Sequence, residues 1–470
     1  MKISTYRKAL GVALFWLFIW QILYWFVGKD LIVPSPLQTF KTLGRILSGH
    51  AFYLDAAATL SRCVAGIFYS LLVGLVTAFL SYRLSLVRHI LSLPVLVFKA
   101  TPVMAVILFL ILCLTSGQVP IFVCFLMCYP VVYTNTLSGL DALGHKYLEM
   151  AKLYQLSQAD TLRHVMIPAI LPQLLASMRL LAGLSWKTVV AAEVLASPHF
   201  SMGYNLLNAK IYLETPELFA WIISIICLSL AFEKILCLGL NLFSLKPYSG
   251  SKVLKNQRWS KGKSNDSSIG DELSSSVVIH NLSKSYAQKQ IFSNFNAVFP
   301  ENKTTAILAP SGAGKTTLLR ILAGLEPYPC GKIEGIQKGR VSFLFQEDRL
   351  LPWLNVYDNM AIVLKNQMSS QKAHAEIVQM LHLLNLTENL YNMPDQLSGG
   401  MKHRVAIGRT FLYPATLLLL DEPFRGIDSA LKERLFSTLW PIYAGKKTIL
   451  LATHQQEDVN RLADQQISLS

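Results

Sequence analysis

The stretch Ile307–Gly324, ILAPSGAGKTTLLRILAG, decides the fold of the second half of this chain. It follows the phosphate-binding pattern G-x-x-x-x-G-K-[ST], except that Ala309 stands at the first position. Residues 305–309 are predicted to form a strand and residues 315–324 a helix, with a glycine-rich turn between them. Backbone N–H groups of such a turn, helped by the helix dipole, attract an anion. The stretch therefore predicts a nucleotide site on an α/β domain.

Two side chains of this loop have the chemistry that a nucleoside triphosphate and its metal ion need. Lys315 is placed to reach the β and γ phosphates, and the Thr316 hydroxyl is placed to bind Mg²⁺. Ala309 adds one methyl group, which costs on the order of 1 kcal/mol only if the turn needs a positive φ there. We therefore expect a functional loop. The residues predicted to contact the nucleotide are Ser311, Gly312, Ala313, Gly314, Lys315, Thr316 and Thr317.

A second motif is an apolar strand that ends in two acids, TLLLLDEP at 416–423. Asp421 is placed to hold the Mg²⁺ shell, and Glu422 can orient and polarise the attacking water as a general base. Taken alone, the same residues also fit a strand that ends in a solvated acidic turn. The neighbouring motifs therefore have to decide between these two interpretations.

The stretch QLSGGMKHRVAIGRT at 396–410 resembles the signature of the ATP-binding-cassette family, with Met where Gln is commoner. The resemblance covers about Val277 to Ser470, because further family motifs follow in the family's order. It implies a signature sequence formed by Leu397, Ser398, Gly399, Gly400 and Met401.

The same resemblance implies roles for single residues. Tyr286, in LSKSY, matches the aromatic residue that stacks on adenine, and Gln346 matches the glutamine of the Q-loop. Asp428 matches the D-loop aspartate, and His454 matches the switch histidine that contacts the γ-phosphate. The expected catalytic residues are Glu422, His454 and Gln346, and the expected metal ligands are Thr316, Gln346 and Asp421.

Cassettes of this family pair head to tail, so the resemblance also implies a partner. Each ATP would lie between the phosphate loop of one cassette and the Ser398 and Gly400 motif of the other. The chain is therefore expected to dimerise with itself or with a similar half-transporter, with ATP and Mg²⁺ as cofactors. Arg425 and Gly426 depart from the family pattern, but neither removes a group that touches the metal or the water.

The first half of the chain has the composition of a membrane domain. Over the whole chain, 52% of residues are hydrophobic and 15% are charged, against about a quarter charged in a soluble domain. We expect an all-α polytopic membrane domain at 1–245, a flexible linker at 246–276 and an α/β P-loop NTPase domain at 277–470. A spanning helix needs about 20 mostly apolar residues, which predicts about six spans. They are 9–27, 56–81, 87–113, 119–139, 169–195 and 216–243.

The net charge of +15 does not indicate nucleic-acid binding, because the basic residues form no single face. Many of them flank apolar spans instead, and Lys and Arg collect on the cytoplasmic side of a membrane. The basic loops after the second and fourth spans, with the basic N-terminus, place both ends of the chain in the cytoplasm. We expect a multi-pass protein of the cytoplasmic membrane, surrounded by lipid, with its ATPase domain in the cytoplasm.

The loop at 147–172, YLEMAKLYQLSQADTLRHVMIPAILP, resembles the cytoplasmic loop of binding-protein-dependent importer permeases. Of the family pattern E-A-A-x-x-x-G followed by I-x-x-P, Glu149 and Ala151 match, Gln155 stands for Gly, and Pro168 falls where expected. The resemblance implies a short helix that docks on the cassette near the Q-loop. The alternative is an ordinary amphipathic connector. We call residues 147–168 the coupling loop.

Several ionisable residues lie in or near the predicted spans, where facing lipid would be costly. They include the candidates Lys99, Lys187 and Glu193, together with Arg62 and Arg179. One interpretation is that they line a pathway for an anionic or zwitterionic solute, with Lys99 as the best candidate. The other is that they snorkel near helix ends or pair inside the helix bundle.

The combined motifs predict ATP-driven import of a small solute by a fused half-transporter that works with an extracytoplasmic solute-binding protein. The closest subgroup resembles permeases for nitrate, sulfonates, taurine and related nutrients, some of which carry thiamine precursors. Three alternatives stay open: an exporter fused in the same order, a membrane-anchored ATPase with a regulatory role, and an inactive cassette that pairs with an active partner.

Overall fold

The computed structural model describes residues 2–244, 276–286, 289–310 and 312–469, and the predicted linker lies outside this range except for Ser276. The chain forms two compact units. The first unit comprises Met1–Ala142 and Ile170–Leu245, and the second comprises Leu143–Ala169 and Lys246–Ser470. The second unit thus includes the coupling loop, which the sequence analysis assigned to the membrane domain.

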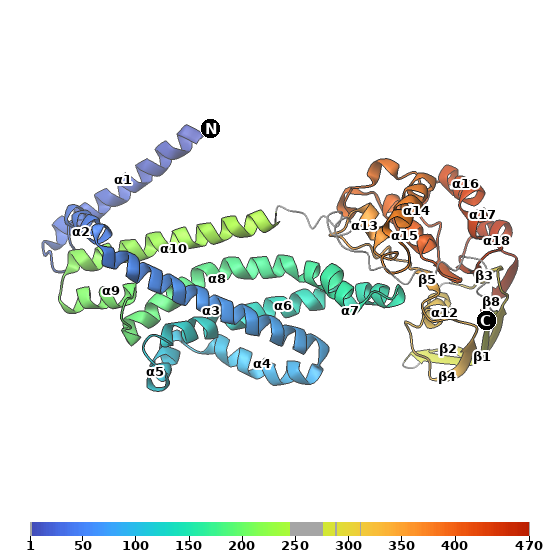
Figure 1. Ribbon diagram of the computed structural model, residues 1–470, viewed down its shortest axis with the longest axis horizontal. Coiled ribbons are helices and arrows are strands. Elements are labelled where there is room, and N and C mark those ends of the chain that lie inside the picture. Colours follow the sequence, from blue (N-terminus) through green and yellow to red (C-terminus); the bar gives the residue numbers. More distant parts are fainter. Residues whose placement is uncertain (1, 245–275, 287–288, 311, 470) are drawn as a thin grey trace. The chain divides into compact units, whose positions relative to one another are not determined.

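The first unit is built from helices in the part that the structure describes (Figure 1). Long apolar runs explain the longest of them, two of which also contain an interior proline, Pro130 or Pro172. The amphipathic second helix begins at a capping box formed by Ser35 and Gln38. The helices that lie in it wholly or mainly are α1 (Lys2–Val27), α2 (Pro36–Ser48), α3 (His50–Arg83), α4 (Ser85–Ala100), α5 (Val103–Cys113), α6 (Val119–Leu153), α8 (Ile167–Ala196), α9 (Met202–Ile211) and α10 (Thr215–Ser244).

All six predicted spans are helical, but one of them is not continuous. Among the described residues, four helices are long and apolar enough to cross a membrane, or five if a bent pair counts as one span. That pair, α4 and α5, bends by 106°, so the span predicted at 87–113 is a broken pair of helices and not one continuous helix. The break falls at Thr101 and Pro102, because proline lacks an N–H and disfavours helix at the residue before it. Within α1, Leu14–Val27 counts as a shorter apolar helix.

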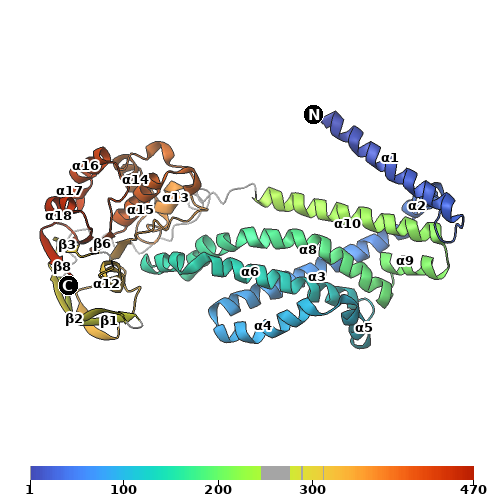
Figure 2. The same ribbon diagram turned by 180° about the vertical axis from the view of Figure 1, so that it is seen from behind.

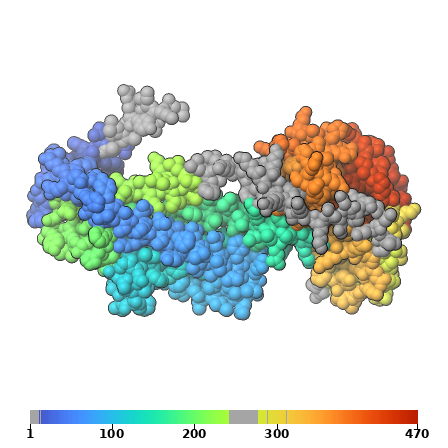
Figure 3. Space-filling model, viewed as in Figure 1, coloured from blue at the N-terminus to red at the C-terminus, as the bar shows by residue number. Residues whose placement is uncertain are grey.

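Close packing holds α3 against α6 in the first unit. A Cβ atom on Gly66 would lie 2.5 Å from Sγ of Cys124, and one on Gly74 would lie 2.7 Å from a methyl carbon of Val132. Only glycine therefore fits at these two positions. Cys63 of α3 and Cys128 of α6 belong to the same core, which takes in α8 through Leu181 and Trp186, α9 through Met202 and α10 through Trp221. On the face shown in Figure 3, α3 and α4 lie side by side at the surface.

The second unit contains a parallel five-stranded sheet in the order β5-β6-β7-β3-β8 and an antiparallel three-stranded sheet in the order β2-β1-β4. Figure 2 shows both sheets from behind. The run Leu417–Leu420 is buried throughout, as expected for a central strand covered on both faces. The strands are β1 (Val277–Tyr286), β2 (Lys289–Phe299), β3 (Thr304–Leu308), β4 (Cys330–Glu334), β5 (Val341–Leu344), β6 (Leu417–Asp421), β7 (Thr448–Ala452) and β8 (Gln465–Ser468).

Helices surround the parallel sheet and connect its strands. The segment between β5 and β6 contains only helices and turns, and we call residues 345–416 the helical insertion. The coupling loop adds a short α-helix and a π-helix to this unit. The helices are α7 (Gln158–Asp160), η1 (Thr161–Met166), α12 (Lys315–Leu322), α13 (Val356–Ala361), α14 (Ser370–Leu383), η2 (Thr387–Asn389), η3 (Pro394–Gln396), α15 (Gly399–Leu412), α16 (Ser429–Thr438), α17 (Trp440–Tyr443) and α18 (Gln456–Leu462).

Candidate functional site

Three of the predicted motifs meet at the carboxyl edge of the parallel sheet. The phosphate loop follows β3, the acidic pair ends β6, and His454 follows β7. Because β7 lies between β6 and β3, segments that are far apart in the sequence become neighbours at this edge. Ligands of open parallel sheets bind outside the carboxyl ends of the strands, so this edge is the candidate nucleotide site.

The phosphate loop uses glycine where the backbone requires it. Gly312 and Gly314 adopt positive φ values of 80° and 98°. A Cβ atom on Gly314 would also lie 2.5 Å from the Ile291 side chain. Ala309 does not adopt a positive φ, so its methyl group causes no left-handed strain. The side chain of Lys315 turns back over the loop and donates hydrogen bonds to the backbone carbonyls of Ala309 and Pro310.

Two of the three predicted metal ligands, Thr316 and Asp421, lie next to each other. The Thr316 hydroxyl donates a hydrogen bond of 2.7 Å to Oδ2 of Asp421. Asp421 is only 2% exposed. Burial raises the pKa of Asp421, and the hydrogen bond from Thr316 offsets part of that effect. A hydroxyl beside a buried carboxylate is an oxygen donor set of the kind that Mg²⁺ prefers.

The Glu422 carboxylate lies between two basic side chains. Oε1 of Glu422 is 3.2 Å from Nδ1 of His454, and Oε2 is 4.0 Å from a guanidinium nitrogen of Arg425. Glu422 has a φ of 50°, and its N–H donates to the Ala452 carbonyl of the neighbouring strand. This unusual backbone conformation turns the side chain away from the strand and toward His454. Gln346 is exposed just after β5.

Tyr286 lies at the end of β1 and is 43% exposed. The ammonium group of Lys284 lies 4.7 Å from the ring centroid and is itself held by Glu326 at 2.8 Å. Burial raises the pKa of Tyr286, and the Glu326 carboxylate adds to the rise. Sequence reasoning singled out Tyr286 but not these two supporting residues.

The signature and the D-loop each open a helix. The exposed side chain of Ser398 caps α15 by accepting the N–H of Met401 at 3.3 Å. Asp428 caps α16 in the same way, accepting the N–H of Leu431 at 2.9 Å. Leu397 is buried, whereas Gly399 is exposed and Gly400 is half-buried. The predicted contact Ser311 lies outside the described residues, and Ala313 and Thr317 are half-buried in or just after the loop.

The coupling loop contacts the cassette through Glu149. Its carboxylate accepts two hydrogen bonds from Arg320 of α12, at 2.7 and 3.1 Å, and one from Arg349 at 2.7 Å. Two of these bonds form the bidentate pairing that suits arginine and carboxylate. Arg349 belongs to the stretch that follows Gln346, so Glu149 joins the phosphate-loop helix and the Q-loop segment. Neither arginine was predicted from the sequence as a partner of this loop.

The other residues of the coupling-loop motif also have defined places. Ala151 and Pro168 are buried. Gln155, which stands where the family has glycine, adopts a positive φ of 50°. Its side chain packs directly over Gly339, where a Cβ atom would collide with it. Gln155 therefore keeps the left-handed backbone that glycine would supply, and it makes a contact that glycine could not make.

The three candidates for a solute pathway differ in their surroundings. Lys99 lies in the last turn of α4, next to the break before α5, and is exposed. Lys187 of α8 is exposed as well. Glu193 is fully buried and is ion-paired with Arg62 at 2.6 Å.

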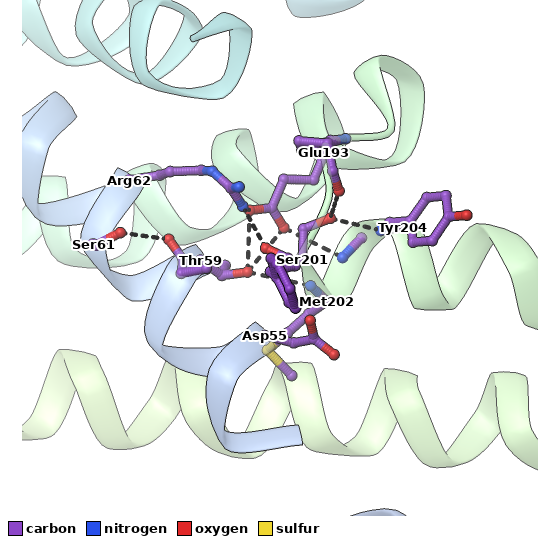
Figure 4. A network of polar contacts seen from close by, with 12 residues as sticks. Asp55, Thr59, Ser61, Arg62, Glu193, Ser201, Met202 and Tyr204 are labelled. Carbon is purple, nitrogen blue, oxygen red and sulfur yellow. Dashed lines mark hydrogen bonds and ion pairs between the residues drawn. The ribbon is translucent and has the colours of Figure 1, made fainter. Parts of the chain in front are cut away.

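Figure 4 shows how several elements of the first unit converge on Glu193. The hydroxyl of Thr59 and the N–H of Gly203 donate to its carboxylate. Arg62 also donates to the backbone carbonyls of His199 and Phe200. The group thus ties α3 to α8 and to the loop before α9, which is the arrangement expected of a pair inside a helix bundle.

Two family models match this chain. The model described as ABC transporter matches residues 292–425. The model described as binding-protein-dependent transport system inner membrane component matches residues 70–236.

Curated relatives match the cassette. The sulfate/thiosulfate import ATP-binding protein CysA of Neisseria meningitidis serogroup A is 35% identical over 205 residues, which are 40% of this chain and 57% of that protein. The protein of that name from Escherichia coli K12 is 34% identical over 210 residues, which are 42% of this chain and 58% of that protein. The chain thus spans little more than half the length of these relatives. The aliphatic sulfonates import ATP-binding protein SsuB of Delftia acidovorans is 35% identical over 193 residues, which are 41% of this chain and 78% of that protein.

The two domain matches agree with the two kinds of architecture in the structure. Apolar helices lie where the inner-membrane model matches, which makes this a multi-pass protein of the inner membrane with its cassette in the cytoplasm. The α/β unit lies where the cassette model and the relatives match. The chain therefore belongs to the ABC transporter family and joins a permease domain of the binding-protein-dependent type to an ATP-binding cassette.

Proposed function

We propose that two copies of this chain form an importer in which ATP hydrolysis by the paired cassettes moves a small solute through the permease domains. The observation that carries this proposal is the contact between Glu149 of the coupling loop and Arg320 of the cassette. Arg320 lies on α12, the helix that begins at Lys315 of the phosphate loop. A permease loop that is held by the phosphate-loop helix can respond to what that loop binds. An exporter has no need of this importer-type loop and is not favoured.

In the proposed reaction, this chain's residues bind ATP and activate water. The exposed ring of Tyr286 receives the adenine on the face that Lys284 does not cover, and Lys315 leaves the loop carbonyls for the phosphates. Glu422 orients the attacking water and accepts its proton, while His454 holds the other carboxylate oxygen. The water oxygen bonds to the γ-phosphorus as Glu422 takes its proton, and the bond between the γ-phosphorus and the β–γ bridging oxygen breaks. ADP leaves with the electron pair of that bond, and inorganic phosphate is the other product.

Mg²⁺ fits this site as the partner of ATP. Thr316 and Asp421 would hold it, since their oxygens already face each other, and Gln346 would complete the protein contacts. When bound, the ion neutralises charge on the β and γ phosphate oxygens.

Each chain supplies half of two sites in this proposal. Ser398 and Asp428 cap helices at exposed positions, so the N-terminus of α15 is free to meet an anion from another copy. The partner is proposed to be a second copy of the chain or a similar half-transporter. An extracytoplasmic binding protein is proposed to deliver the solute.

The proposed solute is a small oxyanion or zwitterion, such as sulfate, a sulfonate, taurine or nitrate. The relatives named for sulfate and sulfonate import support this class. A thiamine precursor is a second possibility within the subgroup. Lys99 and Lys187 are exposed cations of the permease domain and are the proposed contacts for the anion, whereas Glu193 is proposed to hold the bundle together.

Two measurements on the full-length protein test this function. Purified dimer in lipid nanodiscs should hydrolyse ATP, and Glu422→Gln should bind ATP without hydrolysing it. Proteoliposomes with candidate binding proteins should then accumulate labelled sulfate or taurine only with ATP, and Lys99→Met should lose uptake while retaining hydrolysis. Absence of hydrolysis in the wild type would rule out the proposed enzyme, and ATP-independent uptake would rule out the proposed coupling.

A further inference from the structure

A buried cluster of charged side chains joins the coupling loop to the cassette at a second place, away from Glu149. Asp160, at the end of α7, forms an ion pair with the ammonium group of Lys365 in the turn that follows α13. Both residues are only 9% exposed. Asp160 lies in the coupling loop but at none of the positions that match the family pattern, Lys365 belongs to no sequence motif, and the proposed reaction does not use either residue.

The backbone of the coupling loop is specialised at this point. Residues Thr161–Met166 form a π-helix, which is rare and often marks a functional site. Asp160 and His164, four positions apart, both face Lys365. Nε2 of His164 lies 3.3 Å from the Lys365 ammonium nitrogen and 3.7 Å from Oδ1 of Asp160. The hydroxyl of Ser157 donates to the other Asp160 oxygen at 2.7 Å, so both carboxylate oxygens have donors.

Trp353 adds a contact from the cassette side. Its indole N–H donates to the His164 carbonyl at 2.8 Å, and its ring lies 5.9 Å from the ring of Tyr147. Trp353 and Lys365 both belong to the helical insertion. This part of the cassette thus holds the end of α7 by an ion pair and the π-helix by a side-chain hydrogen bond to its backbone.

We propose that Asp160 and Lys365 form a second attachment, which fastens the coupling loop to the helical insertion at the turn after α13, while Glu149 fastens it to α12 and to Arg349 at the start of the insertion. This inference rests on the proposed function. A buried charge that loses its partner is strongly unfavourable, so the pair accepts only a loop that brings a carboxylate to this position. Arg320 and Lys365 lie on different parts of the cassette, the sheet-packed α12 and the helical insertion. A loop fixed to both passes any movement between them to the permease helices that it connects.

Hydrogen exchange of the full-length protein in nanodiscs tests the attachment. Lys365→Met and Asp160→Asn should each make the amides of residues 157–167 exchange at least about tenfold faster, because the loop opens locally without its partner. Lys365→Arg keeps the charge and should retain protection. Lys332→Met is the matched control, since Lys332 pairs with Glu334 at the exposed surface of the cassette. Unchanged exchange in Lys365→Met, or fast exchange in Lys365→Arg, would overturn the proposal.

A double variant in which the two charged residues exchange places distinguishes an ion pair from two side chains that pack independently. Asp160→Lys combined with Lys365→Asp should bring exchange back to within about threefold of the wild type, because the coupling energy belongs to the pair. If the double variant exchanges as fast as the single ones, the ion pair is not the attachment.

The response to ATP tests the role in coupling. In the wild type, adding ATP should change the exchange of α8 peptides at 170–196, and in Lys365→Met this change should shrink at least fivefold although ATP is still hydrolysed. A full ATP response in Lys365→Met would overturn the inference. No ATP response in the wild type would instead count against the proposed function, while the protection of residues 157–167 still decides whether the attachment exists.

Discussion

The hydroxyl of Thr316 and the carboxylate of Asp421 are 2.7 Å apart, although 105 residues separate them in the sequence. β3 and β6 are not neighbours in the sheet, since β7 lies between them, yet both end at the same edge. The fold of a single chain therefore brings the phosphate loop and the acidic end of β6 into direct contact.

Thr316→Val should remove this contact and the hydroxyl proposed to bind Mg²⁺. Valine has nearly the same shape, so the fold should persist while ATP hydrolysis falls at least about 100-fold. The check is the hydrolysis rate, together with calorimetric titration of ATP with Mg²⁺ and with a chelator. Thr438→Val, at a half-buried position of α16 outside the nucleotide site, is the matched control and should behave like the wild type. Equal ATP affinity with and without Mg²⁺ in the wild type would contradict the assignment.

Ala309→Gly should change little, although glycine is the residue that the phosphate-binding pattern expects. The reason is that Ala309 does not adopt a positive φ, so no left-handed strain is released. We expect hydrolysis and ATP affinity within about twofold of the wild type by steady-state kinetics, since removing one methyl group alters no hydrogen-bond donor. A large gain in activity would show that Ala309 impairs the loop.

The sequence allowed much of the cassette to be predicted, because its motifs are short, local and chemically specific. The roles of Lys315, Thr316 and Asp421 could be predicted from the sequence alone, because the local backbone of a phosphate loop and of a strand end determines where these side chains lie. The partners of the coupling loop could not. Arg320, Arg349 and Lys365 contact the coupling loop from three segments of the cassette. A single basic residue forms no sequence motif, so its partner in the fold could not be predicted.

The membrane half shows the same limit in another form. Each of the six segments that hydropathy predicted is helical, because apolar composition over about 20 residues is a strong signal. It did not reveal the bend between α4 and α5, although Pro102 was visible in the sequence. It also could not decide between a pathway and a buried pair for Glu193, since the partner Arg62 lies on another helix.

Replacing Gln155 should separate backbone strain from side-chain contact in the coupling loop. Gln155→Ala removes the contact with Gly339 but keeps the positive φ, whereas Gln155→Gly removes the contact and relieves about 1 kcal/mol of strain. Hydrogen exchange of residues 150–157 should therefore be about fivefold slower in the glycine variant than in the alanine variant. Equal exchange in the two variants would mean that the backbone at this position carries no strain.

Asp358 of α13 should make the cassette less stable as the pH rises. Burial raises the pKa of Asp358 to about 7, and a hydrogen bond with Asn355 offsets only part of this effect. An acid with a raised folded-state pKa binds more protons when folded, so stability is lost as the pH climbs from about 4 through about 7. Asp358→Asn should raise the unfolding temperature at pH 8, by an amount that corresponds to at most about 4 kcal/mol.

The gain in Asp358→Asn should disappear near pH 4, where the wild-type carboxyl is already neutral. Thermal unfolding of the full-length protein in detergent at both pH values measures the difference. Asp395→Asn, at an exposed position of the same helical insertion, is the control and should show no such pH-dependent gain. A gain in unfolding temperature of equal size at pH 4 and pH 8 would show that the stability difference between aspartate and asparagine at position 358 comes from packing and not from ionisation.

Arg62 and Glu193 should behave as a buried pair whose halves depend on each other. Arg62→Met leaves the Glu193 carboxylate fully buried without its cation, which should cost about 3–5 kcal/mol and lower the unfolding temperature markedly. Arg62→Met combined with Glu193→Gln should lose less stability than Arg62→Met alone, because the neutral amide of the new glutamine can still accept hydrogen bonds from Thr59 and Gly203. Thermal unfolding in detergent compares the variants.

Arg88→Met provides the comparison for that pair, because Arg88 and Asp141 form an ion pair at the surface with 48% and 40% of their side chains exposed. Exposed pairs contribute about 0–1 kcal/mol, so its unfolding temperature should stay close to that of the wild type. A loss in Arg62→Met no greater than in Arg88→Met would remove the buried-pair interpretation and restore Glu193 as a candidate for the solute pathway. A larger loss that the double variant recovers would assign Glu193 to the stability of the bundle and leave the exposed Lys99 and Lys187 as the cations to test in uptake.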